Sequence, residues 1–259
     1  MMPTPIQAII FDYGGTLDSR GNHWSEVIRQ AYETEGVQIG REAFRDAYIH
    51  AERALDGSGI ILPDDNFHAV MRKKIALQFD RLGIDNPQQA EAIATRCYES
   101  ARECVRESAE TLATLARHYP IAIVSNFYGN VRAVLQDFGI LPLVSAIIDS
   151  TAVGIRKPDP AIFATGIDAL SPRLRPGEVL VVGDSIDKDI IPAHTLGCQT
   201  ALLQGTPWDP THPLPPIPPS TIRLTTLSDL LTHPAMQGGL LHRAASRHAG
   251  GMRVAHIGT

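Results

Sequence analysis

Short apolar runs alternate with helix-like segments along most of the chain, and this alternation restricts the fold more than any other feature. Each run is followed by a polar residue or a glycine, which is typical of strands buried on both faces. Because parallel strands are joined through helices, the pattern predicts an α/β fold with a doubly wound, Rossmann-like parallel sheet. The predicted strands are Ile6–Phe11, Ile121–Val124, Ala146–Ile148, Val179–Val182 and Thr200–Leu203.

Residues 20–108 interrupt the alternation with helical periodicity alone. Apolar residues recur there at three- and four-residue steps, and no segment reads as a convincing strand. A block of this length is too long for an ordinary crossover, so we expect a separate all-helical cap inserted after the first strand. The predicted cap helices are Glu26–Glu35, Arg41–Leu55, Asn66–Leu82 and Pro87–Arg106.

The rest of the chain divides into a core and a tail. Residues 1–19 and 109–232 are expected to form the α/β core. Its further helices are predicted around Val131–Phe138 and from Asp159-Pro160, where an N-cap precedes a first-turn proline. Residues 233–259 contain glycine pairs, several histidines and little periodicity, so a flexible tail is expected. The histidine spacing matches no compact metal site.

Composition excludes several classes of function. The net charge of −5 gives no basic surface for nucleic acid. No apolar run approaches the ~20 residues that cross a bilayer, and the N-terminus lacks the features of a signal peptide. The cysteines Cys97, Cys104 and Cys198 are scattered, so we expect reduced thiols in a cytoplasmic protein. Nothing in the pattern indicates the oligomeric state.

Reactive side chains follow the predicted strands where each strand ends. Asp12 ends the first strand, Ser125-Asn126 follows the second, and Asp184 follows Val179–Val182. Carboxyl ends of parallel strands meet at one edge of the sheet, where open α/β sheets bind ligands. Two further charged residues are placed nearby by the chain: Lys157, between a strand end and a helix start, and Asp189, shortly after Asp184.

These residues predict phosphoryl transfer on a small phosphorylated substrate. Three carboxylates at one edge repel one another unless a positive charge lies between them. Mg²⁺ suits a partly open carboxylate site that also takes a phosphate. Ser125 offers a hydroxyl, Asn126 and Phe127 offer backbone N–H groups to an anion, and Lys157 offers a positive charge to an anionic transition state.

Four ordered signatures resemble those of the haloacid dehalogenase superfamily. The spacing agrees over about residues 6–205, and the helical insert occupies the position of that superfamily's cap. The signatures are Phe-Asp-Tyr-Gly-Gly-Thr-Leu-Asp at 11–18, Val-Ser-Asn at 124–126, Arg-Lys-Pro-Asp-Pro at 156–160 and Val-Gly-Asp-Ser-Ile-Asp-Lys-Asp at 182–189.

The resemblance implies a role for each matching residue. Asp12 would be the nucleophile that forms an aspartyl-phosphate, and Lys157 would pair Asp12 with the phosphate. Ser125 would bind the phosphoryl oxygens. The implied magnesium ligands are Asp12, the backbone carbonyl of Gly14, Asp184 and, directly or through water, Asp189.

Gly14 departs from the phosphatase pattern, because a second Asp normally stands at that position. That Asp protonates the leaving group and then activates water. Three explanations stay open. His23, on the linker into the cap, would replace it as acid/base; the substrate would need no acid, as with an acyl phosphate or a carbon–phosphorus bond; or the chain would be a phospho-ligand-binding pseudoenzyme without efficient turnover.

The carbon–phosphorus alternative makes a further demand on the cap. Phosphonoacetaldehyde hydrolases resemble this chain in lacking the second Asp, and they use a Schiff-base lysine on the cap. Lys73 or Lys74 would have to serve, although both are expected on a solvated helix face. Asp18 is expected only to cap a turn. Haloacid dehalogenases also lack the second Asp, but they work without metal, and the acidic pattern from Asp184 to Asp189 favours a phosphatase.

Overall fold

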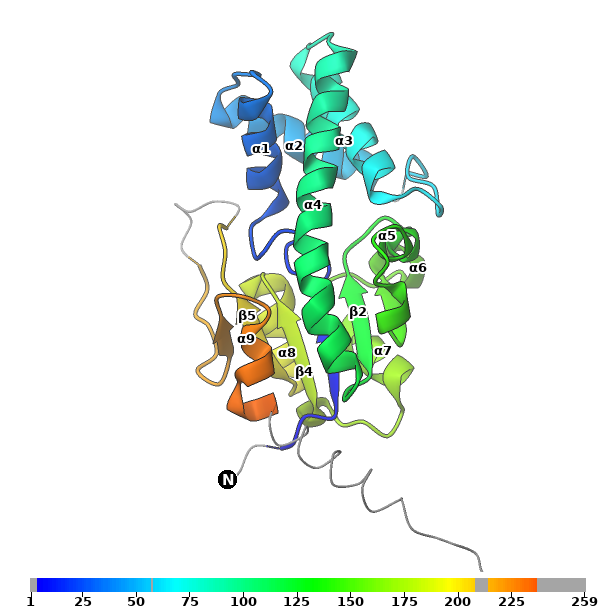
Figure 1. Ribbon diagram of the computed structural model, residues 1–259, viewed down its shortest axis with the longest axis vertical. Coiled ribbons are helices and arrows are strands. Elements are labelled where there is room, and N and C mark those ends of the chain that lie inside the picture. The colour runs from blue at the N-terminus through cyan, green and yellow to red at the C-terminus, as the bar shows by residue number, and fades with distance from the viewer. Residues whose placement is uncertain (1–3, 57, 208–213, 237–259) are drawn as a thin grey trace, which may run out of the picture.

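A six-stranded parallel sheet forms the core of the protein. The computed structural model describes residues 4–56, 58–207 and 214–236. Within them the strand order is β3-β2-β1-β4-β5-β6, and every neighbouring pair is parallel (Figure 1). The strands are β1 (Ala8–Phe11), β2 (Ile121–Ser125), β3 (Ala146–Asp149), β4 (Val179–Gly183), β5 (Gln199–Leu203) and β6 (Ile222–Leu224). The first five match the predicted strands closely, and β6 was not predicted.

Helices cover both faces of this sheet, as the doubly wound prediction requires. Side chains alternate along β1, so that Ile9 and Phe11 pack on one face and Ala8 and Ile10 on the other. The long helix α4, with α5 and α9, covers the first face, and α7 and α8 cover the second. The core helices are α5 (Val131–Asp137), α6 (Ser150–Val153), α7 (Ala161–Leu170), α8 (Ile191–Leu196) and α9 (Asp229–Thr232). Three short helical segments lie between these helices and the strands: the 3₁₀ helices η1 (Leu141–Leu143) and η2 (Pro176–Glu178) and the π-helix η3 (Ile186–Ile190).

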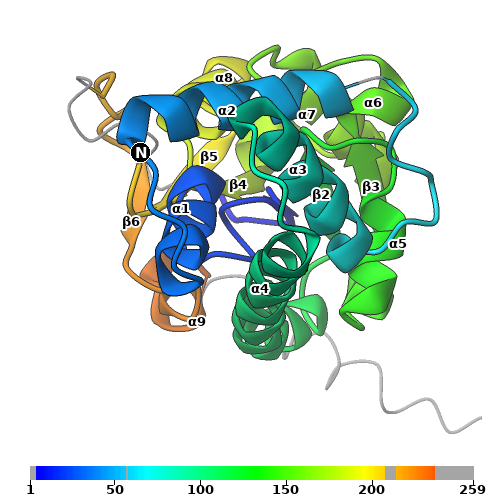
Figure 2. The same cartoon turned by 90° about the horizontal axis from the view of Figure 1, so that it is seen from above.

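Four helices form the cap above the carboxyl ends of the strands. They are α1 (Trp24–Thr34), α2 (Arg41–Leu55), α3 (Phe67–Leu82) and α4 (Pro87–Ala116). Viewed from above, they surround the segment that follows β1 (Figure 2). All four lie where the periodicity predicts them.

The predicted boundary between cap and core at residue 108 falls inside α4. No glycine or proline occurs between Gln88 and Ala116, so nothing in the sequence stops the helix there. The helix therefore runs from the cap down over the sheet, where Leu112 and Leu115 are buried (Figure 1). A single helix thus belongs to both domains.

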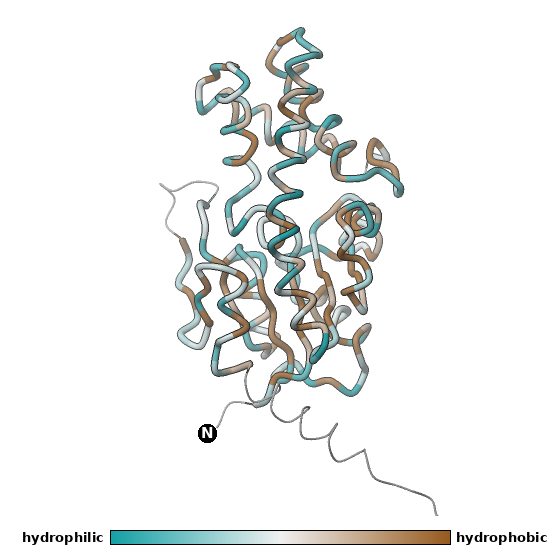
Figure 3. Tube along the Cα trace, viewed as in Figure 1, coloured by the Kyte–Doolittle hydropathy of each residue, from teal (hydrophilic) through white to brown (hydrophobic). Residues whose placement is uncertain are grey.

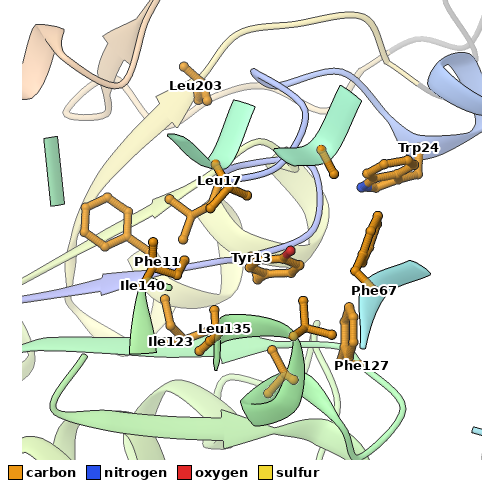
Figure 4. Packing of buried hydrophobic residues seen from close by; sticks show 14 of the residues in the cluster. Phe11, Tyr13, Leu17, Trp24, Phe67, Ile123, Phe127, Leu135, Ile140 and Leu203 are labelled. Atoms are coloured by element: carbon orange, nitrogen blue, oxygen red, sulfur yellow. The ribbon is translucent and has the colours of Figure 1, made fainter. Parts of the chain in front are cut away.

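The cap and the core share one continuous apolar cluster. Trp24 and Phe67 of the cap pack with ring centroids 5.1 Å apart and ring planes tilted by 55°, and Phe67 lies edge-on to Tyr13 of the core at 6.5 Å (Figure 4). Tyr13 in turn meets Phe127 at 5.7 Å. The central strands β1, β2 and β4 are hydrophobic, whereas hydrophilic positions recur along α4 (Figure 3). In this conformation the cap is closed over the strand ends.

The core extends slightly beyond residue 232, where the tail was predicted to begin. Met236 is buried, and its carbonyl accepts a hydrogen bond from the Tyr119 hydroxyl at 2.8 Å. Residues 237–259, the greater part of the predicted tail, lie outside the described residues. In the described part of the chain, no helix has the length and apolar character that crossing a membrane requires.

Candidate active site

Asp12 is buried immediately after β1 and is held there by its neighbours. Its N–H donates to the Val182 carbonyl at 2.9 Å. The Thr16 hydroxyl reaches both Asp12 Oδ2 at 3.3 Å and Asp184 Oδ1 at 3.0 Å. Gly15, between them, has φ +101°, and a Cβ there would lie 2.5 Å from an Asp184 oxygen. The turn after β1 therefore requires glycine at position 15.

Lys157 connects two of the carboxylates. Its Nζ lies 2.6 Å from Asp12 Oδ1 and 2.7 Å from Asp189 Oδ1, and all three residues are buried. Asp189 lies on η3, against Gly183 at the end of β4, where any Cβ would come within 2.4 Å of the Asp189 side chain. These residues, far apart in the sequence, therefore meet at the carboxyl edge as expected from the topology.

The site holds more negative charge than its lysine can balance. Asp12, Asp184 and Asp189 each place a carboxylate oxygen within 4.8 Å of the others. Burial, and then the charges of Asp12 and Asp189, raise the pKa of Asp184 well above its ordinary value. Burial also raises the pKa of Asp189 to about 6, although Lys157 opposes the shift. An oxygen-rich set short of positive charge fits a hard divalent cation.

Ser125 and Asn126 follow β2 into the same site but use their side chains differently. Ser125 is buried and lines the outer cleft together with Asp12 and Lys157. The Asn126 side chain donates from Nδ2 to the Lys157 carbonyl at 3.0 Å and accepts from the Lys157 N–H at 2.9 Å. The side-chain amide of Asn126, a residue predicted to bind substrate, thus positions the Lys157 backbone.

The expected anion cradle after β2 is smaller than the sequence suggested. The Phe127 N–H donates to Ser150 Oγ at 3.1 Å, so the prediction that it faces a bound anion is wrong. The N–H groups of Gly129 and Val131 donate to Asp149 Oδ2, at 2.9 and 3.2 Å. Asp149 ends β3 at the same edge, and its position after an apolar run was the signal that sequence reasoning missed.

Gly14 lines two pockets of the protein. One is an outer cleft of about 700 Å³ and the other an inner cavity of about 130 Å³ between cap and core. A Cβ built on Gly14 would meet no atom within 4 Å. The space that a side chain would occupy is therefore open, and the backbone carbonyl of Gly14, which the resemblance implies as a metal ligand, is retained.

His23 also borders both spaces, at the start of the cap. Its Nδ1 caps α1 by accepting the Ser25 N–H at 3.2 Å, so the proton of the neutral ring is on Nε2. Burial, and then the charge of Lys188, lower the pKa of His23 to about 4. The ring is therefore uncharged at neutral pH, which favours a hydrogen-bond donor over the general acid that the sequence suggested.

Lys74 does not lie on a solvated helix face, contrary to expectation. It is buried in the wall of the inner cavity, with Nζ 2.6 Å from Glu52 Oε1. Burial alone would lower the pKa of Lys74, but the charge of Glu52 reverses the effect and raises it. A Schiff-base lysine must lose its proton to react, so this environment argues against that role. Lys73 points elsewhere, to Asp65 and the Ile60 carbonyl.

Asp18 has the turn-capping role expected of it and one unexpected property. Its Oδ1 accepts the Gly15 N–H at 2.7 Å, and its Oδ2 accepts from Trp24 Nε1 at 3.0 Å. Burial raises the pKa of this carboxyl to about 7, against the opposing effect of these hydrogen bonds. Asp18 therefore connects the turn after β1 to the first residue of the cap and titrates near neutrality.

Comparison with known proteins agrees with this geometry. The family model for haloacid dehalogenase-like hydrolases matches residues 6–197. A phosphoglycolate phosphatase of Cereibacter sphaeroides is 39% identical over 218 residues, which cover 81% of this chain and 91% of that protein. The haloacid dehalogenase-like hydrolase domain-containing protein 3 of Danio rerio is 27% identical over 240 residues, covering 88% and 96%.

One solved structure illustrates the shared fold. It is the magnesium-bound HAD-hydrolase of Bacillus subtilis, with a TM-score of 0.55, 18% identity, and coverage of 88% of this chain and 98% of that one. At this identity the likeness concerns the fold alone. The extent of the family match and the curated relatives together establish that this chain belongs to the haloacid dehalogenase-like hydrolase family.

Proposed function

We propose that the protein is a magnesium-dependent phosphatase that acts on a small phosphorylated metabolite through an aspartyl-phosphate on Asp12. The observation that carries the proposal is the position of Lys157 Nζ, in contact with both Asp12 and Asp189 beside Asp184. The relatives named phosphoglycolate phosphatase support a small phosphate ester as substrate. The three cysteines are free and buried, which supports the expected cytoplasmic location.

Each residue has a defined task in this reaction. Asp12 forms a bond to phosphorus while the bond to the leaving-group oxygen breaks, and water then attacks the same phosphorus and releases phosphate and Asp12. Lys157 offsets the charge between Asp12 and the phosphoryl group, and the Ser125 hydroxyl donates to a phosphoryl oxygen. Magnesium, held by Asp12, the Gly14 carbonyl and Asp184, would neutralise charge on the phosphoryl oxygens. Trp24 and Phe67, packed on the core, exclude bulk water.

Phosphate release from a panel of phosphate monoesters tests this proposal. We expect release with Mg²⁺, its loss on adding a chelator and its recovery with fresh Mg²⁺. The Asp12→Asn variant keeps the shape of the side chain but removes the nucleophile, so it sets the background. If no ester releases phosphate faster with the wild type than with Asp12→Asn, the protein is not a phosphatase of this kind.

Gly14 supports one competing function, a phospho-ligand-binding protein without efficient turnover. The missing acid/base would slow both steps, whereas binding needs only the cation, Ser125 and Lys157. The two functions differ in their covalent chemistry, because only the enzyme forms an acyl phosphate on Asp12, which survives acid and is cleaved by alkali or hydroxylamine. Mass spectrometry of the protein, quenched in acid after mixing with acetyl phosphate, distinguishes them. Halide release from 2-haloacids, measured in parallel, tests the dehalogenase alternative.

A further inference from the structure

The inner cavity beside Gly14 carries a buried ion pair that the proposed reaction does not use. Lys74 comes from α3 and Glu52 from α2, with Lys74 Nζ 2.6 Å from Glu52 Oε1. The hydroxyl of Tyr128, from the core loop after β2, donates to Glu52 Oε2 at 2.6 Å. Tyr48 also hydrogen-bonds Glu52. All four residues line the cavity, so cap and core build this wall together.

Burying the Lys74–Glu52 ion pair costs free energy. Two charges removed from water lose more hydration than their attraction returns, so a buried pair is weak evidence for a stabilising role. Burial alone would raise the pKa of Glu52, yet the Lys74 charge and the hydrogen bonds to Glu52 lower it, so both groups are ionised at neutral pH. If the Lys74–Glu52 pair does not stabilise the fold, another reason must account for its place in the wall of a cavity beside Gly14. Recognition of a ligand in that cavity is such a reason.

The hydrogen bonds that Lys74 and Glu52 already make determine what the pair can offer to a ligand. Glu52 already accepts from Lys74, Tyr128 and Tyr48. An ammonium has three donors, and the hydrogen bond to Glu52 uses one of those on Lys74. The rings of Tyr48 and Tyr128 flank Nζ, with centroids 5.8 and 5.4 Å away. This wall therefore offers the remaining N–H donors of Lys74 to an oxygen atom of a ligand, whereas the carboxylate of Glu52 is already occupied by three donors.

The charge of the wall and the size of the inner cavity limit which oxygen acceptors a ligand can place there. Glu52 cancels the charge of Lys74, so the pair offers no net positive charge to a further carboxylate. The inner cavity, at about 130 Å³, is much smaller than the outer cleft of about 700 Å³, so it suits a short leaving group of two or three carbons better than a long one. A hydroxyl fits this environment and can also donate to the leaving-group oxygen beside Gly14, which an ionised carboxylate cannot do.

We propose that the inner cavity is the leaving-group subsite, and that Lys74, charge-compensated by Glu52, selects phosphate monoesters of two- or three-carbon alcohols that end in a neutral hydroxyl over those that end in a carboxylate. The selection rests on the proposed function, because the ester is held at Asp12. It departs from the phosphoglycolate named for the curated relatives, whose leaving group ends in a carboxylate.

The decisive comparison is 2-hydroxyethyl phosphate against 2-phosphoglycolate, two esters with leaving groups of similar length. We expect the wild type to favour 2-hydroxyethyl phosphate in kcat/KM by about tenfold or more, as one hydrogen bond to a charged group supplies. Glu52→Gln leaves the Lys74 charge uncompensated, so it should shift the ratio at least tenfold toward 2-phosphoglycolate. Lys74→Met should raise KM for 2-hydroxyethyl phosphate about tenfold.

Matched variants separate selection from folding. Lys73→Met removes the neighbouring lysine, which binds Asp65 outside the cavity, and should leave the ratio unchanged. The double variant Glu52→Gln/Lys74→Met removes both charges, so it avoids an unpaired buried charge and should bring the two esters within a few-fold of each other. Thermal melting of each variant identifies any that fail to fold.

The outcomes distinguish this proposal from the function on which it rests. An unchanged ratio in Glu52→Gln, with phosphate still released, overturns the subsite and leaves the phosphatase intact. Absence of release above Asp12→Asn with every ester overturns the phosphatase. In that case calorimetry with the two esters, in the Asp12→Asn background with and without Glu52→Gln, still decides the subsite, because the same reversal must appear in Kd.

Discussion

Restoring a carboxylate at position 14 is the most direct test of how the chain handles protons. The structure leaves room for the change, because a Cβ on Gly14 meets no atom within 4 Å and the backbone there does not need positive φ. Gly14→Asp should therefore fold without a steric penalty. Gly14 lines both the outer cleft and the inner cavity, so the new carboxyl would face the place where the proposed function puts the leaving-group oxygen.

The size of the effect follows from what general acid–base help contributes. A positioned acid or base gives about 10²–10⁴-fold, or roughly 2.7–5.4 kcal/mol at 1.36 kcal/mol for each tenfold. The acid matters only where the leaving group is a poor one. We therefore expect Gly14→Asp to accelerate alkyl phosphates by about 10²-fold or more, and p-nitrophenyl phosphate and acetyl phosphate little in the first step.

A leaving-group series measures this effect. The logarithm of kcat/KM is plotted against the pKa of the leaving alcohol for several aryl and alkyl phosphates, with wild type and variant side by side. The slope should be steep for the wild type and flatter for Gly14→Asp. Gly40→Asp is the matched control, because Gly40 also has open space at its Cβ but precedes α2 in the cap and lines neither cavity. Equal slopes, or an equal gain from Gly40→Asp, would refute the reasoning.

Three further predictions follow from the buried charges. Lys157→Met leaves Asp12 and Asp189 without their partner, so kcat should fall about 10²–10³-fold and the free energy of unfolding in urea, measured with chelator, by about 3 kcal/mol. Asp18 has its pKa raised from 3.8 to about 7, so as pH rises only the unfolded chain releases this proton and stability falls. Between pH 5 and 8, Asp18→Asn should therefore gain about 2.5 kcal/mol on the wild type in urea unfolding, and an equal difference at both pH values would contradict the assignment. His23→Gln keeps a side-chain donor, so it should retain most of kcat/KM with an unchanged pH profile between pH 5 and 8, whereas a tenfold loss would restore His23 as acid/base.

Much of the fold and the core of the site follow from local patterns in the sequence. Several apolar runs of the sheet end at or just before the residue that delivers its side chain to the edge, as with Asp12 after β1 and Ser125 at the end of β2. Right-handed crossovers then bring these ends together without further information. The contact of Lys157 with Asp12 and Asp189 is the outcome. β6 escaped prediction because a strand of three residues, Ile222–Leu224, is too short to show a pattern.

The features that sequence reasoning missed depend on partners far along the chain. Lys73 and Lys74 look alike in the sequence, yet Lys74 is buried because Glu52, 22 positions earlier, and Tyr128 close around it. The contact of the Asn126 side-chain amide with the Lys157 backbone likewise depends on the fold and leaves no mark in the local sequence. The continuity of α4, by contrast, was readable, since no helix-breaking residue separates its two halves.

Under the proposed function, Gly14 and Lys74 both act on one atom of the substrate, the oxygen of the leaving group. Around the inner cavity, burial keeps the pKa of His23 low, and Lys74 and Glu52 hold each other ionised, so none of the three is tuned to transfer a proton near neutral pH. A hydroxyl on the leaving group would then be its own donor, polarised by Lys74. 2-Hydroxyethyl phosphate should therefore outpace ethyl phosphate in the wild type, and Gly14→Asp should shrink that advantage, because the new carboxyl makes the substrate hydroxyl redundant. An advantage that survives Gly14→Asp at full size would mean that the hydroxyl contributes binding alone.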